Sequence, residues 1–187
     1  MKVAHTFTHA ELVLIAYRWV LRSGGAAVAF RELVTIAMET PDVLGIGGAV
    51  SSILIECKIS RGDFLADRKK PWRLNPSLGM GGHRIYCAPA GLLSLEELPE
   101  KWGLLSVAPD RKCTLTYRPD PERPRAKFLC DRFGQPHDKE KEAAVMLSAL
   151  RRLQNMGLVE NIYRTSARGP VPPEELPAGP ALDANAA

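Results

Sequence analysis

Glu56 and Lys58 are the first residues of chemical interest, because each interrupts an otherwise apolar stretch, Ser-Ser-Ile-Leu-Ile-Glu-Cys-Lys. The stretch is rich in β-branched residues and is typical of a buried strand. Side chains two residues apart on a strand emerge on the same face, so the acid and the cation would project together while Cys57 points the other way. An exposed cross-strand ion pair is the ordinary explanation of such a pattern. The surrounding residues must therefore decide whether Glu56 and Lys58 form such an ion pair or belong to a reactive site.

A second acid, Asp42, directly precedes another apolar run, Val43 to Ile46. Gly47-Gly48 separates this run from the next, which predicts two adjacent antiparallel strands. Asp42, near the beginning of the first strand, would then lie beside Glu56 and Lys58 at the end of the second. Two carboxylates suit a hard divalent cation, and such a cation can hold phosphate oxygens and lower the pKa of a water molecule. This is the chemistry that phosphodiester cleavage requires.

The order Pro41-Asp42, thirteen intervening residues and Glu56-Cys57-Lys58 resembles the motif of the PD-(D/E)XK nuclease superfamily. Such a triad alone arises often by chance, but the sequence that follows is similar to one small single-domain branch. That branch includes MmcB-like DNA-repair proteins and phage-borne small nucleases. The resemblance extends over about residues 26–107 and is carried downstream by segments 59–70, 84–86 and 98–104.

The resemblance implies an α/β fold with a restriction-endonuclease-like core, in which helices flank a mixed central sheet. It also implies hydrolysis of DNA with Mg2+ or Mn2+ in repair, recombination or phage DNA processing. Asp42 and Glu56 would bind the metal together with the backbone carbonyl of Cys57. Lys58 would position the attacking water or help to deprotonate it. Many relatives act as dimers, so a homodimer is compatible with this reading.

A third acid often completes such sites, and two residues compete for the role. Glu32 stands ten residues before Asp42, in the position that this branch favours, whereas Glu11 stands where resolvase-like members place theirs. We prefer Glu32. Basic residues after the triad could contact phosphates, since cations near a duplex release condensed counterions, although a solvated helix face explains them equally well. The candidate DNA-contacting residues are Ser60, Arg61, Arg68, Lys69, Lys70 and Arg73.

The composition is that of a single globular domain: 187 residues, of which 45% are apolar and 25% are charged. A net charge of +4 permits a polyanionic partner without announcing one. The four cysteines form no CxxC pair, which favours reduced thiols in a cytoplasm. No apolar run approaches the roughly 20 residues that cross a bilayer. We therefore expect a cytoplasmic protein with DNA as its partner and no membrane association.

Local patterns predict the elements that position these residues. A capping box at Thr8 and Glu11 begins a helix that ends near Arg22. His5 and His9 are four residues apart, but the residues between them argue against a formed helix, so no metal pair is expected there. The remaining expected elements are a weak strand within 26–38, a helix from Ser60 limited by Pro71, strands at 84–88 and 103–107, and a mobile glycine-rich turn at 79–82.

We expect one nuclease-like domain over residues 1–165, with its core at about 8–108. A C-terminal hairpin, 112–118 with 126–130, and an amphipathic helix at 138–156 would complete it. The Pro/Ala-rich segment 166–187 is predicted to be a disordered tail. Two other functions stay open: a catalytically inactive nucleic-acid-binding module with the same fold, and a winged-helix-like regulator that binds DNA through residues 138–164.

Overall fold

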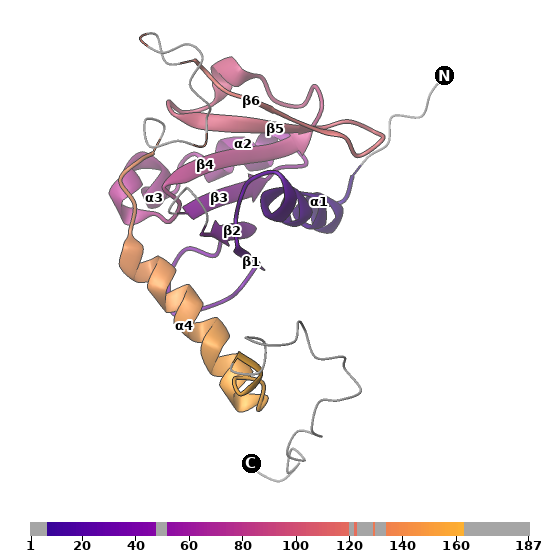
Figure 1. The fold of residues 1–187 in the computed structure, drawn as a ribbon. Helices are drawn as coiled ribbons and strands as arrows, with labels where there is room; N and C mark the ends of the chain where they lie inside the picture. Colours follow the sequence, from indigo (N-terminus) through magenta and orange to yellow (C-terminus); the bar gives the residue numbers. More distant parts are fainter. Residues whose placement is uncertain (1–6, 48–51, 120–121, 123–128, 130–133, 163–187) are drawn as a thin grey trace.

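A mixed β-sheet forms the centre of the molecule (Figure 1). The computed structural model describes residues 7–47, 52–119, 122, 129 and 134–162. Within them the sheet has six strands in the order β1-β2-β3-β4-β5-β6, antiparallel except for the parallel pairs β3–β4 and β4–β5. The strands are β1 (Val28–Arg31), β2 (Val43–Ile46), β3 (Ser52–Cys57), β4 (His83–Pro89), β5 (Trp102–Val107) and β6 (Cys113–Thr116).

Helices flank this sheet, which confirms the predicted α/β class with a mixed central sheet. None of the described helices is long and apolar enough to cross a membrane. The helices are α1 (His9–Arg22), α2 (Arg61–Asp67), α3 (Pro71–Leu74) and α4 (Lys139–Asn155), with 3-10 turns η1 (Pro76–Leu78) and η2 (Leu95–Glu97).

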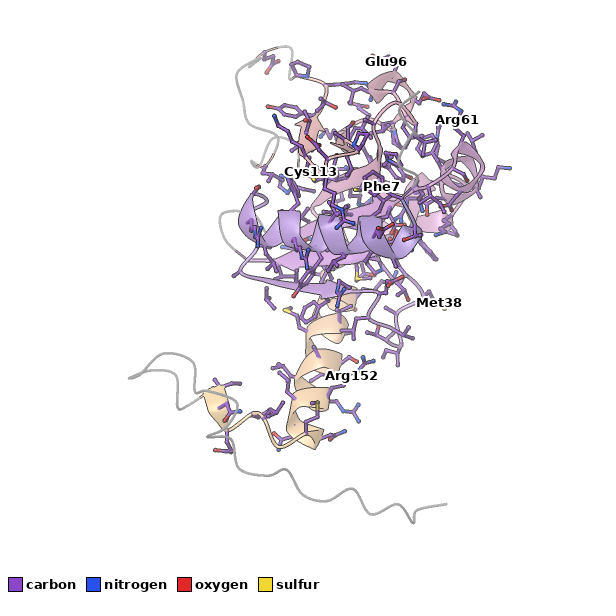
Figure 2. The ribbon with its side chains drawn as sticks, turned by 90° about the vertical axis from the view of Figure 1, so that its right-hand side faces the viewer. Phe7, Met38, Arg61, Glu96, Cys113 and Arg152 are labelled. Carbon is purple, nitrogen blue, oxygen red and sulfur yellow. The ribbon has the colours of Figure 1, made fainter. Side chains whose placement is uncertain are left out.

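Helix α1 covers one face of the sheet, and Figure 2 looks onto it. Its capping box is formed as predicted: the Thr8 side chain accepts from the Glu11 amide, and the Glu11 carboxylate accepts from the Thr8 amide. Its apolar stripe includes the fully buried Leu12 and Ala16, which belong to the same core cluster as Ile55 of β3. The apolar spacing of the sequence is therefore what docks the helix.

The opposite face of the sheet carries a second apolar cluster and the short helices α2 and α3 that follow β3. Tyr86 is central to it: its ring stacks on Trp102 at 4.4 Å between centroids and meets Phe64 edge-on at 5.0 Å. Because successive strand residues alternate between faces, Leu54 and Glu56 point to this side while Ile55 points to α1. Glu56 is thus an acid on a buried face.

The glycine-rich segment 79–82, predicted to be mobile, is held by hydrogen bonds to side chains. The Gly81 amide donates to Glu142 of α4 (2.8 Å), and the Gly82 amide donates to the Ser52 hydroxyl (2.9 Å). The Ser52 hydroxyl in turn donates to Glu142 (2.7 Å). A further bond runs from the Met80 amide to a Glu39 carboxylate oxygen (2.6 Å). Carboxylates that are distant in the sequence hold this loop, which its glycine content alone does not reveal.

The C-terminal part agrees with the predictions only in places. Helix α4 forms where it was expected, with Asp138 as its N-cap. Strand β6 pairs with β5, and most of its predicted hairpin partner, 126–130, lies outside the described residues. The predicted tail, 166–187, also lies outside them.

Candidate active site

Three acids occupy neighbouring backbone positions at one end of the sheet. The β1–β2 pairing continues in a hydrogen bond from the Glu32 amide to the Asp42 carbonyl (3.1 Å). The β2–β3 register, carried one residue beyond its last pair, sets Asp42 opposite Glu56. The β3–β4 register then pairs Glu56 with Tyr86. We call Glu32, Asp42 and Glu56 the acid row; the antiparallel pairing predicted from the sequence sets the backbones of its last two members opposite each other.

Asp42 is the junction of the acid row. Its Oδ2 accepts a hydrogen bond from the backbone amide of Cys57 (2.6 Å), which ties it to the end of β3. The same oxygen lies 3.4 Å from Nε2 of His9, at the start of α1. The side chain is 15% exposed, so it is accessible yet held from two sides.

Glu56 is buried, with both carboxylate oxygens beside cations. Oε2 lies 3.3 Å from Nζ of Lys58, and Oε1 lies 2.8 Å from Nη2 of Arg73. Burial raises the pKa of Glu56 to about 7; Arg73 and Lys58 oppose the rise, and the neighbouring Asp42 and Asp67 add to it. A carboxyl whose pKa lies near neutrality this deep in a protein is typical of functional sites, although structural ion clusters also produce such shifts.

Lys58 faces several acids at once. Besides Glu56, its Nζ lies 3.5 Å from Asp67 and 3.9 Å from Asp63, and its side chain is buried. Burial alone would lower the pKa of Lys58, but the carboxylates outweigh that effect and raise the pKa above its ordinary value. The ammonium group therefore stays charged at neutral pH. It can position a water molecule or stabilise an anion, but it is a poor proton acceptor.

Arg73 anchors the buried charges, so its predicted role as a DNA-contacting residue is wrong. Its guanidinium pairs with Glu39 (2.5 Å) and Asp67 (2.8 Å) as well as with Glu56, and its side chain is 1% exposed. Tyr86 donates a hydrogen bond to the same Asp67 oxygen (2.8 Å). A guanidinium with three acidic partners and no solvent contact is unavailable to a phosphate.

Ser60 and Arg61, also predicted to contact DNA, have protein partners. The Ser60 side chain accepts from the Asp63 amide and caps α2, as its position before the helix predicted. Arg61 is exposed and forms an ion pair with Glu97. Both remain at the surface, where a contact with a nucleic acid is sterically open.

The other predicted cations lie on or just after α2. The Arg68 guanidinium lies over the Phe64 ring, 5.6 Å from its centroid. Lys69 is exposed, and Lys70 is 44% exposed with its Nζ 2.7 Å from Asp67. Part of the positive charge of this segment is thus directed inward at the buried acids.

The third acid of the site is better matched by Glu32 than by Glu11. Glu11 is engaged in the α1 capping box and in an ion pair with Arg111 (3.2 Å). Glu32 follows the end of β1, where its backbone turns to a φ of 45°, and its Oε1 lies 3.8 Å from Nδ1 of His9. Among the described residues, His9, Glu32 and Asp42 form a group whose ligand atoms all lie within 4.8 Å of one another.

Sequence reasoning missed His9 and Glu39. The sequence offered no reason to pair His5 with His9 in a metal site and did not link His9 to the acids, yet α1 begins at His9 and brings it to Asp42. Glu39 lies in a segment without periodicity, and its partners, Arg73 and Met80, are more than thirty residues away. The one sequence feature that could have indicated Glu39 is its position as an acid three residues before Asp42.

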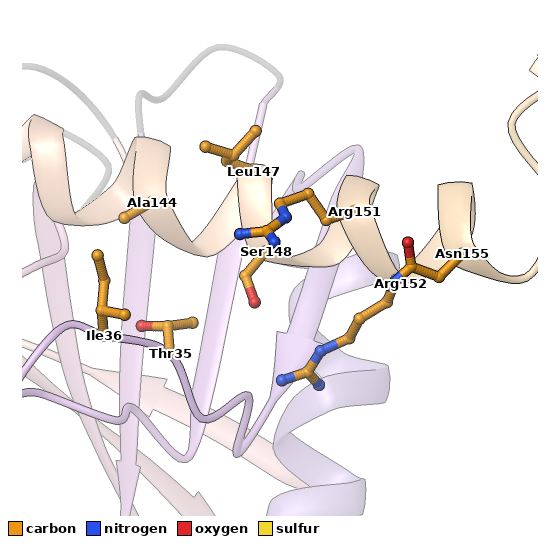
Figure 3. Close-up of a pocket in the computed structure, with 8 residues that line it drawn as sticks. All are labelled: Thr35, Ile36, Ala144, Leu147, Ser148, Arg151, Arg152 and Asn155. Atoms are coloured by element: carbon orange, nitrogen blue, oxygen red, sulfur yellow. The ribbon is translucent and has the colours of Figure 1, made fainter. Parts of the chain in front are cut away.

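A separate pocket lies along α4, on the side of the loop after β1 (Figure 3). Arg152 closes one end through a hydrogen bond to the Val34 carbonyl (2.8 Å). None of the described residues that line the pocket is acidic. Its lining residues are Thr35, Ile36, Ala144, Leu147, Ser148, Arg151, Arg152 and Asn155.

Comparison with known proteins supports the fold and gives no information about an activity. No protein-family model and no curated protein sequence matches the chain. A solved structure of a protein of unknown function from Silicibacter pomeroyi is similar, with 25% sequence identity and a TM-score of 0.51. The match covers 83% of this chain and 96% of that one. The similarity therefore extends over most of both molecules.

The pKa of Glu56 predicts an unusual dependence of stability on pH. Between pH 4.5 and 7 the folded protein retains the Glu56 proton that the unfolded chain has released, so the free energy of unfolding falls as the pH rises. Glu56→Gln removes this dependence. With EDTA present, the stability of the variant minus that of the wild type should grow from pH 5 to pH 8, by at most about 3 kcal/mol. Urea unfolding at each pH measures the difference.

Glu100→Gln, at an exposed acid, is the matched control and should follow the wild type. A difference between Glu56→Gln and the wild type that stays constant over this pH range would show that Glu56 ionises with an ordinary pKa.

Proposed function

We propose that the chain is a metal-dependent nuclease that hydrolyses phosphodiester bonds in DNA, in repair, recombination or phage DNA processing. One observation carries the proposal: the β2–β3 register, continued by one residue, sets the backbones of Asp42 and Glu56 opposite each other, with a buried, charged Lys58 beside Glu56. An exposed cross-strand ion pair, the ordinary explanation of the sequence pattern, does not account for a lysine and a glutamate that are both nearly inaccessible to water.

The charges of the buried cluster favour an added cation. Glu39, Glu56 and Asp67 are nearly inaccessible and Asp42 is only slightly exposed, whereas Lys58 and Arg73 are enclosed with them and Lys70 reaches Asp67 from the surface, so four acids face three cations. Repulsion between acids contributes to the raised pKa of Glu56. A divalent cation beside Asp42 and Glu56 would relieve that repulsion, because uncompensated charge is costly in a medium of low polarity.

The donors present fit Mg2+ or Mn2+. Carboxylate and carbonyl oxygens are the ligands of hard cations, and Asp42, Glu56 and the Cys57 carbonyl provide them. Glu56 already lies beside Lys58 and Arg73, but a carboxylate has about four lone-pair positions, so two cationic neighbours leave room for a third. A bound ion would neutralise phosphate oxygens and make a water molecule more acidic.

The protein side chains then have separate tasks. Asp42 and Glu56 would hold the ion, and Arg73 orients Glu56 through Oε1. Lys58, kept protonated by its acidic neighbours, orients the attacking water and offsets the negative charge that builds on the phosphate. The exposed cations Arg61 and Lys69 would supply contacts to the phosphates of the DNA backbone, Arg61 by leaving its ion pair with Glu97.

An inactive nucleic-acid-binding module is the second candidate. Its support is the pairing of both Glu56 oxygens with protein cations, an arrangement that can stand in place of a metal ion. The winged-helix alternative lacks support in the described residues before α4, since 102–107 and 113–116 form strands rather than helices.

Cleavage by carboxylate variants separates the two candidates. The wild type should nick supercoiled plasmid with Mg2+ or Mn2+ and stop when EDTA is added. Asp42→Asn and Glu56→Gln each remove a ligand charge and should lower the rate by about a hundredfold or more. Glu100→Gln should nick at the wild-type rate. Binding of DNA without metal-dependent nicking by the wild type would favour the inactive module.

Lys58→Met tests the role of the ammonium group apart from metal binding. The ligands of the cation remain, so calorimetry should find that Mn2+ still binds. The rate should fall by roughly a hundredfold, about 3 kcal/mol of lost transition-state stabilisation. Lys112→Met, at an exposed lysine, is the control. Cleavage by folded Lys58→Met at the wild-type rate would remove the main chemical support for the proposal.

A further inference from the structure

An imidazole lies beside the acid row, where neither the motif nor the resemblance assigns one. His9 is the first residue of α1, and its Nε2 lies 3.4 Å from Oδ2 of Asp42. Its Nδ1 lies 3.8 Å from Oε1 of Glu32. The two ring nitrogens thus face different acids, and one His9 nitrogen lies within 4.8 Å of one oxygen of each carboxylate.

The backbone holds these three residues firmly. The capping box fixes the first turn of α1, and the buried Leu12 docks that turn on the core. Glu32 and Asp42 are joined by the hydrogen bond that extends the β1–β2 pairing. The Cys57 amide also holds Asp42 from β3. A group of donors on fixed backbones loses little conformational freedom when it binds a ligand.

The side chains are accessible and are not hydrogen-bonded to one another. His9 is 37% exposed and Glu32 is 55% exposed, so an ion from solvent can reach them. Separations of 3.4 and 3.8 Å exceed the usual length of a hydrogen bond, about 2.7 to 3.2 Å. A metal ion takes one nitrogen of an imidazole, and one His9 nitrogen and one oxygen from each acid lie within 4.8 Å of one another, so small rotations of these side chains would bring all three onto one ion.

We propose that His9, Glu32 and Asp42 bind one divalent transition-metal ion, and that the imidazole makes the site prefer Mn2+ to Mg2+. Imidazole nitrogen suits transition metals, whereas Mg2+ demands oxygen ligands. The inference rests on the proposed nuclease function for its role, because Asp42 joins this ion to Glu56 and Lys58. The cluster extends the metal site from the acid pair to the start of α1.

Metal titration of the full chain tests the proposal without reference to activity. Calorimetry should find Mn2+ bound more tightly than Mg2+ by the wild type. His9→Ala should weaken Mn2+ binding about tenfold or more, since even groups that only orient a metal ligand commonly contribute that much. The same substitution should change Mg2+ binding by about twofold at most. Glu32→Gln should weaken the binding of both ions. Arg18→Ala, at an exposed position on the same helix, should change neither.

Electron spin-echo spectroscopy of the Mn2+-loaded wild type gives a direct readout that needs no variant. Coupling to an imidazole nitrogen should appear, and should shift when the histidines are labelled with nitrogen-15. Absence of this coupling, or equal loss of Mn2+ and Mg2+ affinity in folded His9→Ala, would overturn the proposal. Histidine-coupled Mn2+ in a protein that cleaves no DNA would keep this site and refute the nuclease function instead.

Discussion

The burial of the Glu56 carboxylate is the constraint on which the rest of the site depends. A charged acid on a strand face packed by Phe64 and Tyr86 is stable only with partners, and Lys58 and Arg73 provide them. Arg73 in turn needs acids of its own, which ties the loop before β2 and helices α2 and α3 to the end of β3. Helices of four and seven residues are too short to be stable alone, so this charge network is part of what fixes them.

The central part of the site could be predicted from the sequence because it rests on local periodicity. Alternation along β3 puts Glu56 and Lys58 on one face, and the β2–β3 pairing is short enough for the pattern to set the position of Asp42. The network behind them could not be predicted in this way. Arg73 looks like one more surface cation in a basic segment, and only its contact with Glu39, thirty-four residues away, makes it internal.

Asp42 joins two arrangements of different character. On one side, Glu56 belongs to a buried cluster in which cations already accompany the acids. On the other side, Glu32 and His9 are open to solvent and lack tight partners of that kind among the described residues. A metal ion at Asp42 would therefore be coordinated by accessible side chains on the open side and be stabilised by the charges of the buried cluster on the other. With this arrangement an ion would reach Asp42 from solvent without breaking the buried ion pairs.

Anomalous diffraction from crystals soaked in Mn2+ tests most directly whether the acid row is a metal site. A manganese peak is expected within coordination distance of Asp42, with Glu56, Glu32 or His9 completing the ligands. The peak should be lost in Asp42→Asn crystals treated in the same way. A well-ordered acid row without manganese, or a peak that survives Asp42→Asn, would contradict this expectation.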